Sequence, residues 1–94
     1  MSDILHSKKF EKFIVRQRTG QNVYKFENGY GASVVCHIGT YGFENGLCEI
    51  AVFKFDGNGC GVICYRTPIT DDVIGYANTE KRDEVLKKIK ELEE

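Results

Sequence analysis

The sequence predicts an α+β fold: a single antiparallel β-meander of four to five strands with a C-terminal amphipathic helix packed on one face. Short β-rich segments alternate with turns that contain glycine and asparagine over residues 13–66. The pattern changes at the only proline, Pro68. Beyond residue 80, apolar residues recur at helical spacing between charged ones. At 94 residues, the chain is expected to form one domain, 1–94.

The expected strands are short and rich in β-branched and aromatic residues, which suit a pleated sheet. Asn-Gly and Asp-Gly sequences between them tolerate the positive φ that tight hairpins require. The expected strands are 13–18, 23–26, 32–38, 47–55 and 60–66, with turns at 19–22, 27–30, 40–46 and 56–59.

Two helical signals follow. Thr70, with two aspartates after it, predicts an N-cap and a short helical turn that stops near Gly75. Asn78 or Thr79 then caps a C-terminal helix over residues 80–94. Its apolar stripe must lie on the sheet, and it consists of Val85, Leu86, Ile89 and Leu92.

Hairpin registers predict the two faces of the sheet. If Asn28-Gly29 and Gly57-Asn58 are two-residue loops, Tyr24 faces Ser33 and Phe53 faces Val62. Because side chains alternate along a strand, the expected core face holds Val23, Ala32, Val34, Cys36, Ile38, Ile50, Val52, Ile63 and Tyr65. The expected second face holds Tyr24, Phe26, Val35, His37, Ala51, Phe53, Phe55, Val62 and Cys64. The second register also pairs Glu49 with Arg66 as a cross-strand ion pair.

The expected second face carries three phenylalanines and a tyrosine, although the solvent side of such a sheet is usually polar. Three alternatives stay open for what covers this face. The N-terminal segment can fold over it with Ile4, Leu5, Phe10 and Phe13, a second copy can cover it in a homodimer, or a foreign partner can bind it. Residues 1–12 otherwise form a flexible N-terminal segment.

Charge is unevenly distributed, although the net charge is only −1. Residues 1–25 hold six basic and two acidic residues, whereas residues 26–80 hold two basic and seven acidic ones. A basic start on an acidic body can steer a charged partner. No apolar run is long enough for a membrane helix, and the start lacks the apolar region of a secretory signal, so we expect a cytoplasmic protein with reduced thiols and no membrane partner.

Patterns that would indicate an enzyme are weak, and we expect neither catalysis nor a cofactor or metal. The four cysteines lack the C-x2-C spacing of zinc sites. Cys36 and His37 are adjacent in an expected strand, so they point to opposite faces, with Cys36 toward the core. Cys36 and Cys48 can lie opposite each other across the 39–46 loop. A disulfide there requires an oxidising environment, and buried thiols are the simpler expectation.

Single-stranded nucleic acid is an alternative partner. Sheets with exposed aromatic residues and nearby basic residues can stack bases, and Arg16, Arg18 and Lys25 would serve beside the aromatic face. The acidic body disfavours this alternative, because phosphate contacts supply most of the non-specific affinity.

The segments "YKFENGYGASVV" and "TPITDDVIGY", followed by the charged helix, resemble small uncharacterised proteins encoded in phage and prophage genomes. The resemblance runs from about residue 24 to the end. It implies a non-enzymatic protein that binds a host protein or complex in the host cytoplasm and inhibits or modulates it, for example in anti-defence as an anti-CRISPR-like inhibitor. The expected contact residues are Tyr24, Phe26, Phe53 and Phe55 on the sheet, with Tyr41, Phe43 and Glu44 in the 40–46 loop.

Overall fold

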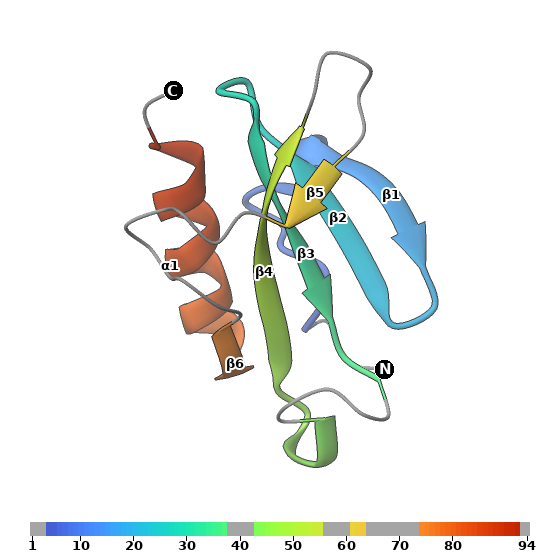
Figure 1. Ribbon diagram of the computed structural model, residues 1–94. Coiled ribbons are helices and arrows are strands. Elements are labelled where there is room, and N and C mark those ends of the chain that lie inside the picture. Colours follow the sequence, from blue (N-terminus) through green and yellow to red (C-terminus); the bar gives the residue numbers. More distant parts are fainter. Residues whose placement is uncertain (1–3, 38–42, 56–60, 64–73, 93–94) are drawn as a thin grey trace.

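The computed structural model confirms the α+β fold and describes residues 4–37, 43–55, 61–63 and 74–92 (Figure 1). Five strands follow one another as an antiparallel meander in the spatial order β1-β2-β3-β4-β5. The elements are η1 (Glu11–Phe13), β1 (Ile14–Arg18), β2 (Gln21–Lys25), β3 (Tyr30–Val35), η2 (Phe43–Asn45), β4 (Cys48–Phe55), β5 (Gly61–Ile63), β6 (Ile74–Ala77) and α1 (Thr79–Lys90). None of the helices in these ranges is long and apolar enough to cross a membrane.

The sixth strand corrects one expectation. β6 pairs antiparallel with the first half of β4, where Cys48 lies opposite Ala77. β5 pairs with the second half of the same edge, so two short strands share the long β4. The short helical turn expected before Gly75 is therefore wrong for residues 74–76, because the free edge of β4 offers backbone partners that an isolated turn lacks. The remaining residues of that expected turn lie outside the described ranges.

The hairpin between β2 and β3 also differs from expectation. Its loop has three residues, because Phe26 donates its N–H to the carbonyl of Tyr30 at 2.8 Å. Gly29 supplies the positive φ, 86°, that such a loop requires. The register therefore moves by one residue, and Tyr24 lies opposite Ala32 rather than Ser33. A shift of one residue exchanges the two faces of a strand.

The β4–β5 register is also shifted by one residue. Phe53 lies opposite Ile63, and Lys54 lies opposite Val62. The expected pairing of Phe53 with Val62 is wrong, and the side chains of Val62 and Ile63 exchange faces. The expected ion pair of Glu49 with Arg66 falls partly outside the described residues.

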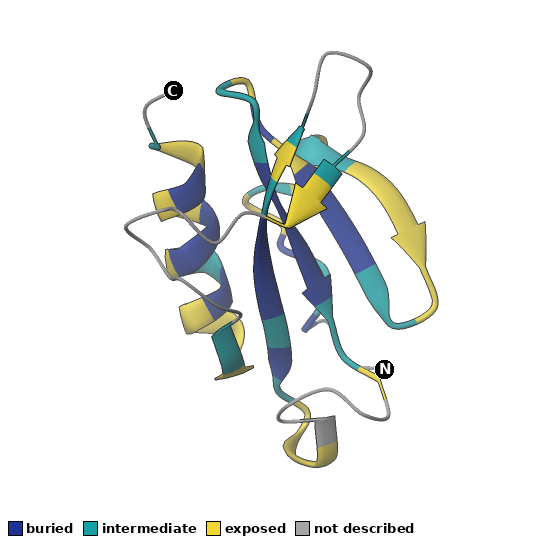
Figure 2. Ribbon diagram, in the orientation of Figure 1, coloured by how far each residue is buried: buried dark blue, intermediate teal, exposed yellow. Residues whose placement is uncertain are grey.

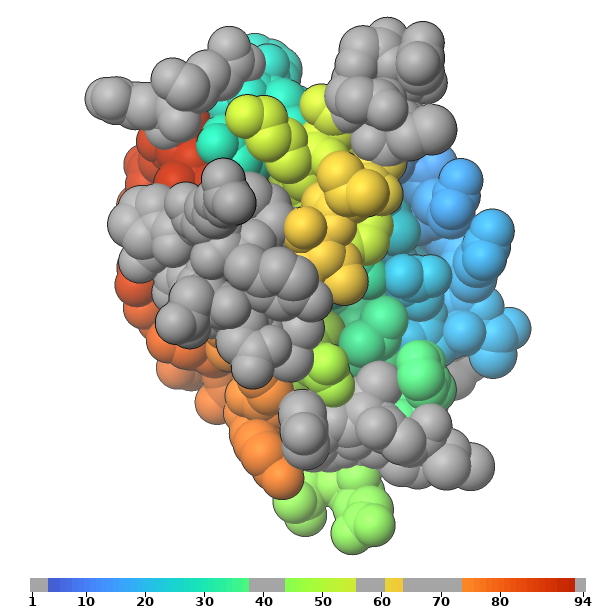
Figure 3. Space-filling view, in the orientation of Figure 1, coloured from blue at the N-terminus to red at the C-terminus, as the bar shows by residue number. Residues whose placement is uncertain are grey.

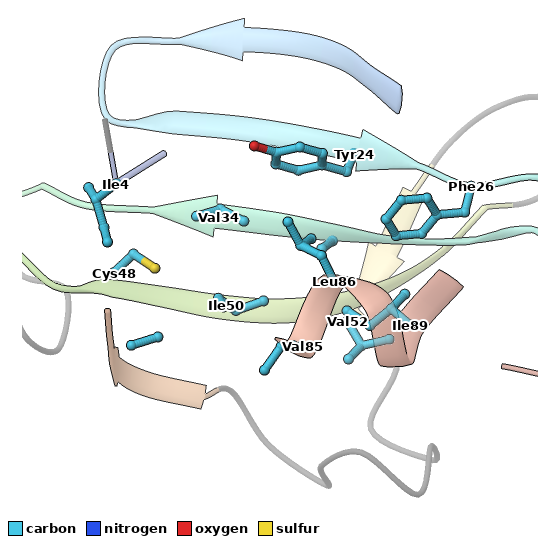
Figure 4. Close-up of a cluster of buried hydrophobic side chains, with 12 residues drawn as sticks. Ile4, Tyr24, Phe26, Val34, Cys48, Ile50, Val52, Val85, Leu86 and Ile89 are labelled. Carbon is cyan, nitrogen blue, oxygen red and sulfur yellow. The ribbon is translucent and has the colours of Figure 1, made fainter. Parts of the chain in front are cut away.

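Helix α1 packs on the core face of the sheet, against β3, β4 and β6. Asn78 caps the helix as expected, because its side chain accepts the N–H of Lys81 at 2.8 Å. Val85, Leu86 and Ile89 of the apolar stripe are buried, and Figure 4 shows them facing the sheet, whereas Leu92 lies beyond the end of α1 and is partly buried. The buried cluster consists of Ile4, Tyr24, Phe26, Ala32, Val34, Cys48, Ile50, Val52, Ala77, Val85, Leu86 and Ile89. Residues of β2, β3 and β4 thus share one core with residues of the C-terminal helix.

The β2–β3 loop is tied to the end of this helix. The side-chain amide of Asn28 lies within 2.9–3.0 Å of the carbonyl oxygens of Ile89, Lys90 and Leu92. Its side-chain oxygen accepts the N–H of Tyr30 at 3.0 Å. One turn residue thus closes its own loop and satisfies carbonyls that the helix C-terminus leaves without intrahelical partners.

The N-terminal segment, residues 4–13, folds over Tyr24 and Phe26, but it does so on the core face, beside the helix (Figure 1). The rings of Phe10 and Phe13 lie edge-on to Phe26, with centroids 6.0 and 5.0 Å away. Of the three alternatives for covering the second face, the N-terminal segment is therefore wrong, because the shift in register moved its two aromatic partners to the core.

Hydrogen bonds fix the start of this segment. The hydroxyl of Tyr24 donates to the carbonyl of Leu5 at 2.6 Å and accepts the N–H of Ser7 at 2.9 Å. From the helix, buried Arg82 donates to the carbonyl of Ile4 at 3.0 Å. Ser7 in turn donates its hydroxyl to Asp83 at 2.7 Å. The described residues of the expected flexible segment are thus held from both sheet and helix.

Candidate binding groove

The second face of the sheet lies opposite the helix and is defined here by Val23, Ser33, Ala51 and Phe53. Register places these side chains together, because Val23 pairs with Ser33, Ser33 with Ala51, and Phe53 lies two residues further along β4. Val23, Ser33 and Ala51 are buried, whereas Phe53 is half-buried. The burial pattern in Figure 2 therefore runs from buried central strands to an exposed β1.

A groove of about 530 Å³ crosses this face between β1 and the end of β4. Figure 3 views the molecule from this side, with β1 in blue and β5 in yellow. The groove is lined by Val15, Arg16, Arg18, Gln21, Val23, Phe53, Phe55 and Gly61. It is therefore apolar along β4 and basic along β1.

Two glycines leave the space that the rings of Phe53 and Phe55 occupy. A Cβ on Gly61 would lie 2.8 Å from the ring of Phe53 and 2.9 Å from that of Phe55. A Cβ on Gly31 would lie 2.6 Å from the ring of Phe55. Without these side chains, the two rings lie against the backbone of the neighbouring strands and contact each other edge-on at 6.2 Å. The rings therefore form a fixed apolar wall.

The opposite wall is positively charged. Arg16 and Arg18 are exposed on β1 and lie on the second face, opposite Val23 and Gln21. The ammonium of Lys25 lies 5.4 Å from the centroid of the Phe55 ring, within the range of a cation–π contact. None of the described residues that line the groove is acidic. The site is thus suited to a ligand that combines negative charge with an apolar group.

The expected contact residues fall into separate places. Phe53 and Phe55 line the groove. Tyr24 and Phe26 are almost completely buried, at 0% and 2% exposure, so the expectation that they lie on the exposed aromatic face is wrong. The cause is the three-residue loop, which turned both side chains toward the core.

The expected contact loop lies at the other end of β4. Glu44 is exposed in η2, before β4 begins at Cys48, whereas Phe55 ends the strand. The strand from Cys48 to Phe55 spans about 23 Å, so Glu44 is remote from the aromatic wall. The backbone of Phe43 belongs to η2, and Tyr41 lies outside the described ranges.

The alternative set fits the groove better. Arg16 and Arg18 line it directly, and Lys25 contacts one of its rings. Of the residues that the nucleic-acid alternative combines, Phe53, Phe55 and the basic trio therefore meet at one site, whereas Tyr24 and Phe26 do not reach it.

Four groove residues were missed from the sequence: Val15, Gln21, Val23 and Gly61. Val23 was expected on the core face, whereas the observed register places it on the second face, opposite Ser33. Gln21 forms part of the groove edge, where its amide donates to the hydroxyl of Ser33 at 2.7 Å. Gly61 was missed because the expected register places it opposite Lys54, whereas it lies opposite Phe55.

The described cysteines lie outside the groove. Cys36 packs against the core, as expected, and His37 is exposed. Burial raises the pKa of the Cys48 thiol to about 12, which makes its nucleophilic thiolate rare near neutral pH. Within the described ranges, no three His, Cys, Asp or Glu side chains are close enough to hold a metal ion. Cys60 and Cys64 fall outside those ranges.

A second hollow of about 410 Å³ lies between the N-terminal segment and the first turns of α1. It is lined by Lys9, Phe10, Thr79, Glu80, Asp83, Glu84 and Lys87. Acidic and basic side chains are mixed there, so it has no charge preference comparable to that of the groove.

Comparison with protein families, with characterised proteins and with solved structures finds no match to this chain.

Proposed function

We propose that this chain is a non-enzymatic binding protein that holds an acidic, partly apolar segment of another protein in the groove and thereby inhibits or modulates that protein. The observation that carries the proposal is the pairing of two walls. Phe53 and Phe55 offer an apolar wall, and Arg16 and Arg18 offer a basic one across a volume of about 530 Å³.

Both walls suit protein recognition. Aromatic and arginine side chains are the residues that most often dominate the binding energy of protein interfaces. The phenylalanines are half-buried and held by their neighbours, so little conformational entropy is lost when they are covered. Arginine forks bind carboxylates in bidentate geometry, which would orient an aspartate or glutamate of the partner.

The proposed partner is a host protein in the cytoplasm, and this part of the proposal follows from the resemblance to phage and prophage proteins. Binding there would act by occupying a surface that the host protein needs. The groove supports binding, and both inhibition and activation of the partner are consistent with it.

Single-stranded nucleic acid is the second candidate, because basic side chains surround two aromatic rings. One observation ranks it lower. The ammonium of Lys25 already lies over the ring of Phe55, at 5.4 Å from its centroid. A base that stacked on this ring would have to displace that contact, whereas a carboxylate could approach Arg16 and Arg18 without doing so.

The test compares wild type with a double charge reversal in the groove, Arg16→Glu with Arg18→Glu. The matched control reverses two exposed lysines of the N-terminal segment, Lys8→Glu with Lys9→Glu, and so changes the net charge equally. Each protein is used to capture partners from host lysate, with quantitative mass spectrometry. The proposal expects one protein to be retained by wild type and by the control but lost with the groove variant.

A fluorescent oligothymidine titration in low and moderate salt is run in parallel. Tight binding that weakens steeply with salt and is lost only with the groove variant would favour the nucleic-acid candidate instead. If both variants capture the same proteins as wild type and no oligonucleotide binds, the groove is not the site.

Self-association is examined with Phe53→Asp and light scattering. A wild-type dimer that this variant converts to a folded monomer would assign the groove to a homodimer interface. The foreign partner would then have to bind elsewhere.

A further inference from the structure

Two thiols lie at the ends of the paired strands β3 and β4. The β3–β4 ladder ends with Val35 opposite Glu49. One residue further, the same register places Cys36 directly opposite Cys48. Both are free thiols in this structure.

The hydrogen bonding determines how close the two backbones are. Cys36 donates its N–H to the carbonyl of Gly20 at 2.9 Å, on the β2 side of β3. Because the backbone groups of one strand residue point to a single neighbour, Cys36 and Cys48 form a non-hydrogen-bonded pair of the β3–β4 ladder. The Cα atoms of such a pair are about 4.5 Å apart, within the range of about 4.4–6.8 Å that disulfides span.

The side chains share one face. Directly opposite residues point to the same side of an antiparallel sheet, and here both thiols point to the core. Cys48 is a member of the buried cluster, and Cys36 packs against it. Besides burial, the charge of Cys36 contributes to the raised pKa of Cys48, which places the two sulfurs within electrostatic reach.

We propose that Cys36 and Cys48 are a redox modification site that closes into a cross-strand disulfide when a low-molecular-weight disulfide such as oxidised glutathione is the oxidant. The inference is independent of the proposed binding function, because the thiols lie on the core face and the groove on the other.

Closure takes two exchange steps. The half-buried Cys36, as its thiolate, attacks one sulfur of oxidised glutathione, and one glutathione thiolate leaves. Cys48, as its thiolate, then attacks the Cys36 sulfur of the mixed disulfide, and the second glutathione leaves. The two protein thiols lose two electrons and two protons, and one oxidised glutathione becomes two reduced ones. Because Cys48 is buried and rarely ionised, it reacts once the Cys36 sulfur beside it has been activated.

The experiment uses the full chain with Cys60→Ser and Cys64→Ser, so that a single pair of thiols remains. The protein is equilibrated with mixtures of reduced and oxidised glutathione, remaining thiols are alkylated, and peptides are mapped by mass spectrometry. We expect a linked Cys36–Cys48 peptide whose yield follows the glutathione ratio and gives the reduction potential of the pair. The cross-link should raise Tm by about 10 °C, because it closes a short loop in the unfolded chain.

Cys36→Ser in the same background is the control, and it should show neither a cross-link nor the rise in Tm. Peptide mapping of wild type provides the same answer if the serine background does not fold. The proposal is overturned if Cys36 stops at the mixed disulfide with glutathione, or if Cys48 stays a free thiol while the other cysteines are oxidised.

Discussion

Asn28 should contribute more to the free energy of unfolding than an ordinary turn residue does. Substitution by alanine removes the amide that lies 2.9–3.0 Å from three carbonyls at the end of α1, and the oxygen that accepts the N–H of Tyr30. The substitution thus removes two donated hydrogen bonds and one accepted hydrogen bond. At about 1 kcal/mol each, and less for partly exposed groups, Asn28→Ala should lower the free energy of unfolding by about 2 kcal/mol.

This loss is measurable by urea denaturation at pH 7, and it corresponds to a fall in Tm of about 10 °C for a domain of this size. Asn45→Ala is the matched control, because Asn45 is exposed in η2. A surface substitution of that kind should stay within about 0.5 kcal/mol of wild type.

The variant Asn28→Asp tests the same contacts through the pH dependence of its stability. Its carboxylate keeps the acceptor for Tyr30 but faces helix carbonyls that carry partial negative charge, so it should be less stable than Asn28→Ala at pH 7. Those carbonyls raise the pKa of the new carboxyl in the folded state. Its contribution is then present below the unfolded pKa of about 3.9 and is lost as pH rises through the folded value. Equal stability of the two variants from pH 3 to pH 7, or Asn28→Ala within 0.5 kcal/mol of wild type, would refute the capping role.

Three further predictions follow from the described contacts. Gly31→Ala should lower the free energy of unfolding by more than about 3 kcal/mol, because its Cβ would overlap the carbonyl oxygen of Tyr24, and a wild-type urea midpoint would contradict this. The stability of wild type should fall above pH 9 by up to about 1.4 kcal/mol per pH unit more than that of Cys48→Ala, since the unfolded thiol ionises near pH 9 whereas the folded pKa is about 12; parallel pH profiles would argue against it. Tyr24→Phe should lower the free energy of unfolding by about 2 kcal/mol, because the hydroxyl bonds both Leu5 and Ser7, and it should speed hydrogen exchange first at the Ser7 amide, which donates to that hydroxyl. Unchanged exchange there would show that the segment is held by other contacts.

Fold class was accessible from the sequence because it depends on local signals. Turn residues, β-branched segments and the apolar stripe of α1 each act within a few residues, and Asn78 was found as an N-cap for the same reason. The boundaries of β4 and α1 differ from expectation by only a few residues, apart from the end of the helix.

Register was not accessible, because the sequence around Asn28 and Gly29 suits loops of two and of three residues. Glycine supplies a positive φ in either case. The three-residue loop places Asn28 in contact with the helix end, 61 or more residues away, and a contact of that range leaves no local signal in the sequence. Since that one-residue difference exchanges faces, it moved Tyr24 and Phe26 from the candidate site into the core.

The candidate site was predicted in part. The nucleic-acid alternative combined Phe53 and Phe55 with Arg16 and Arg18, and the pairing of β1 through β4 brings these four residues to one groove, but the same prediction included the buried Tyr24 and Phe26. β6 was missed because its pairing depends on which part of the β4 edge β5 leaves unoccupied, a property of the assembled sheet.

The hydrogen bonds from Ser7 to Asp83 and from Arg82 to Ile4 join segments 76 and 78 positions apart. Contacts of such long range make folding slow, because most of the chain must be organised before they form. They also make unfolding cooperative: loss of the first segment removes partners from α1, and loss of α1 releases the first segment. During synthesis, α1 follows every strand of the sheet, so the apolar core face of β2, β3 and β4 stays uncovered until the helix has been made. A ribosome-bound chain of this protein should therefore expose a sheet that needs protection from aggregation, and it should reach its stable state only after α1 has left the exit tunnel.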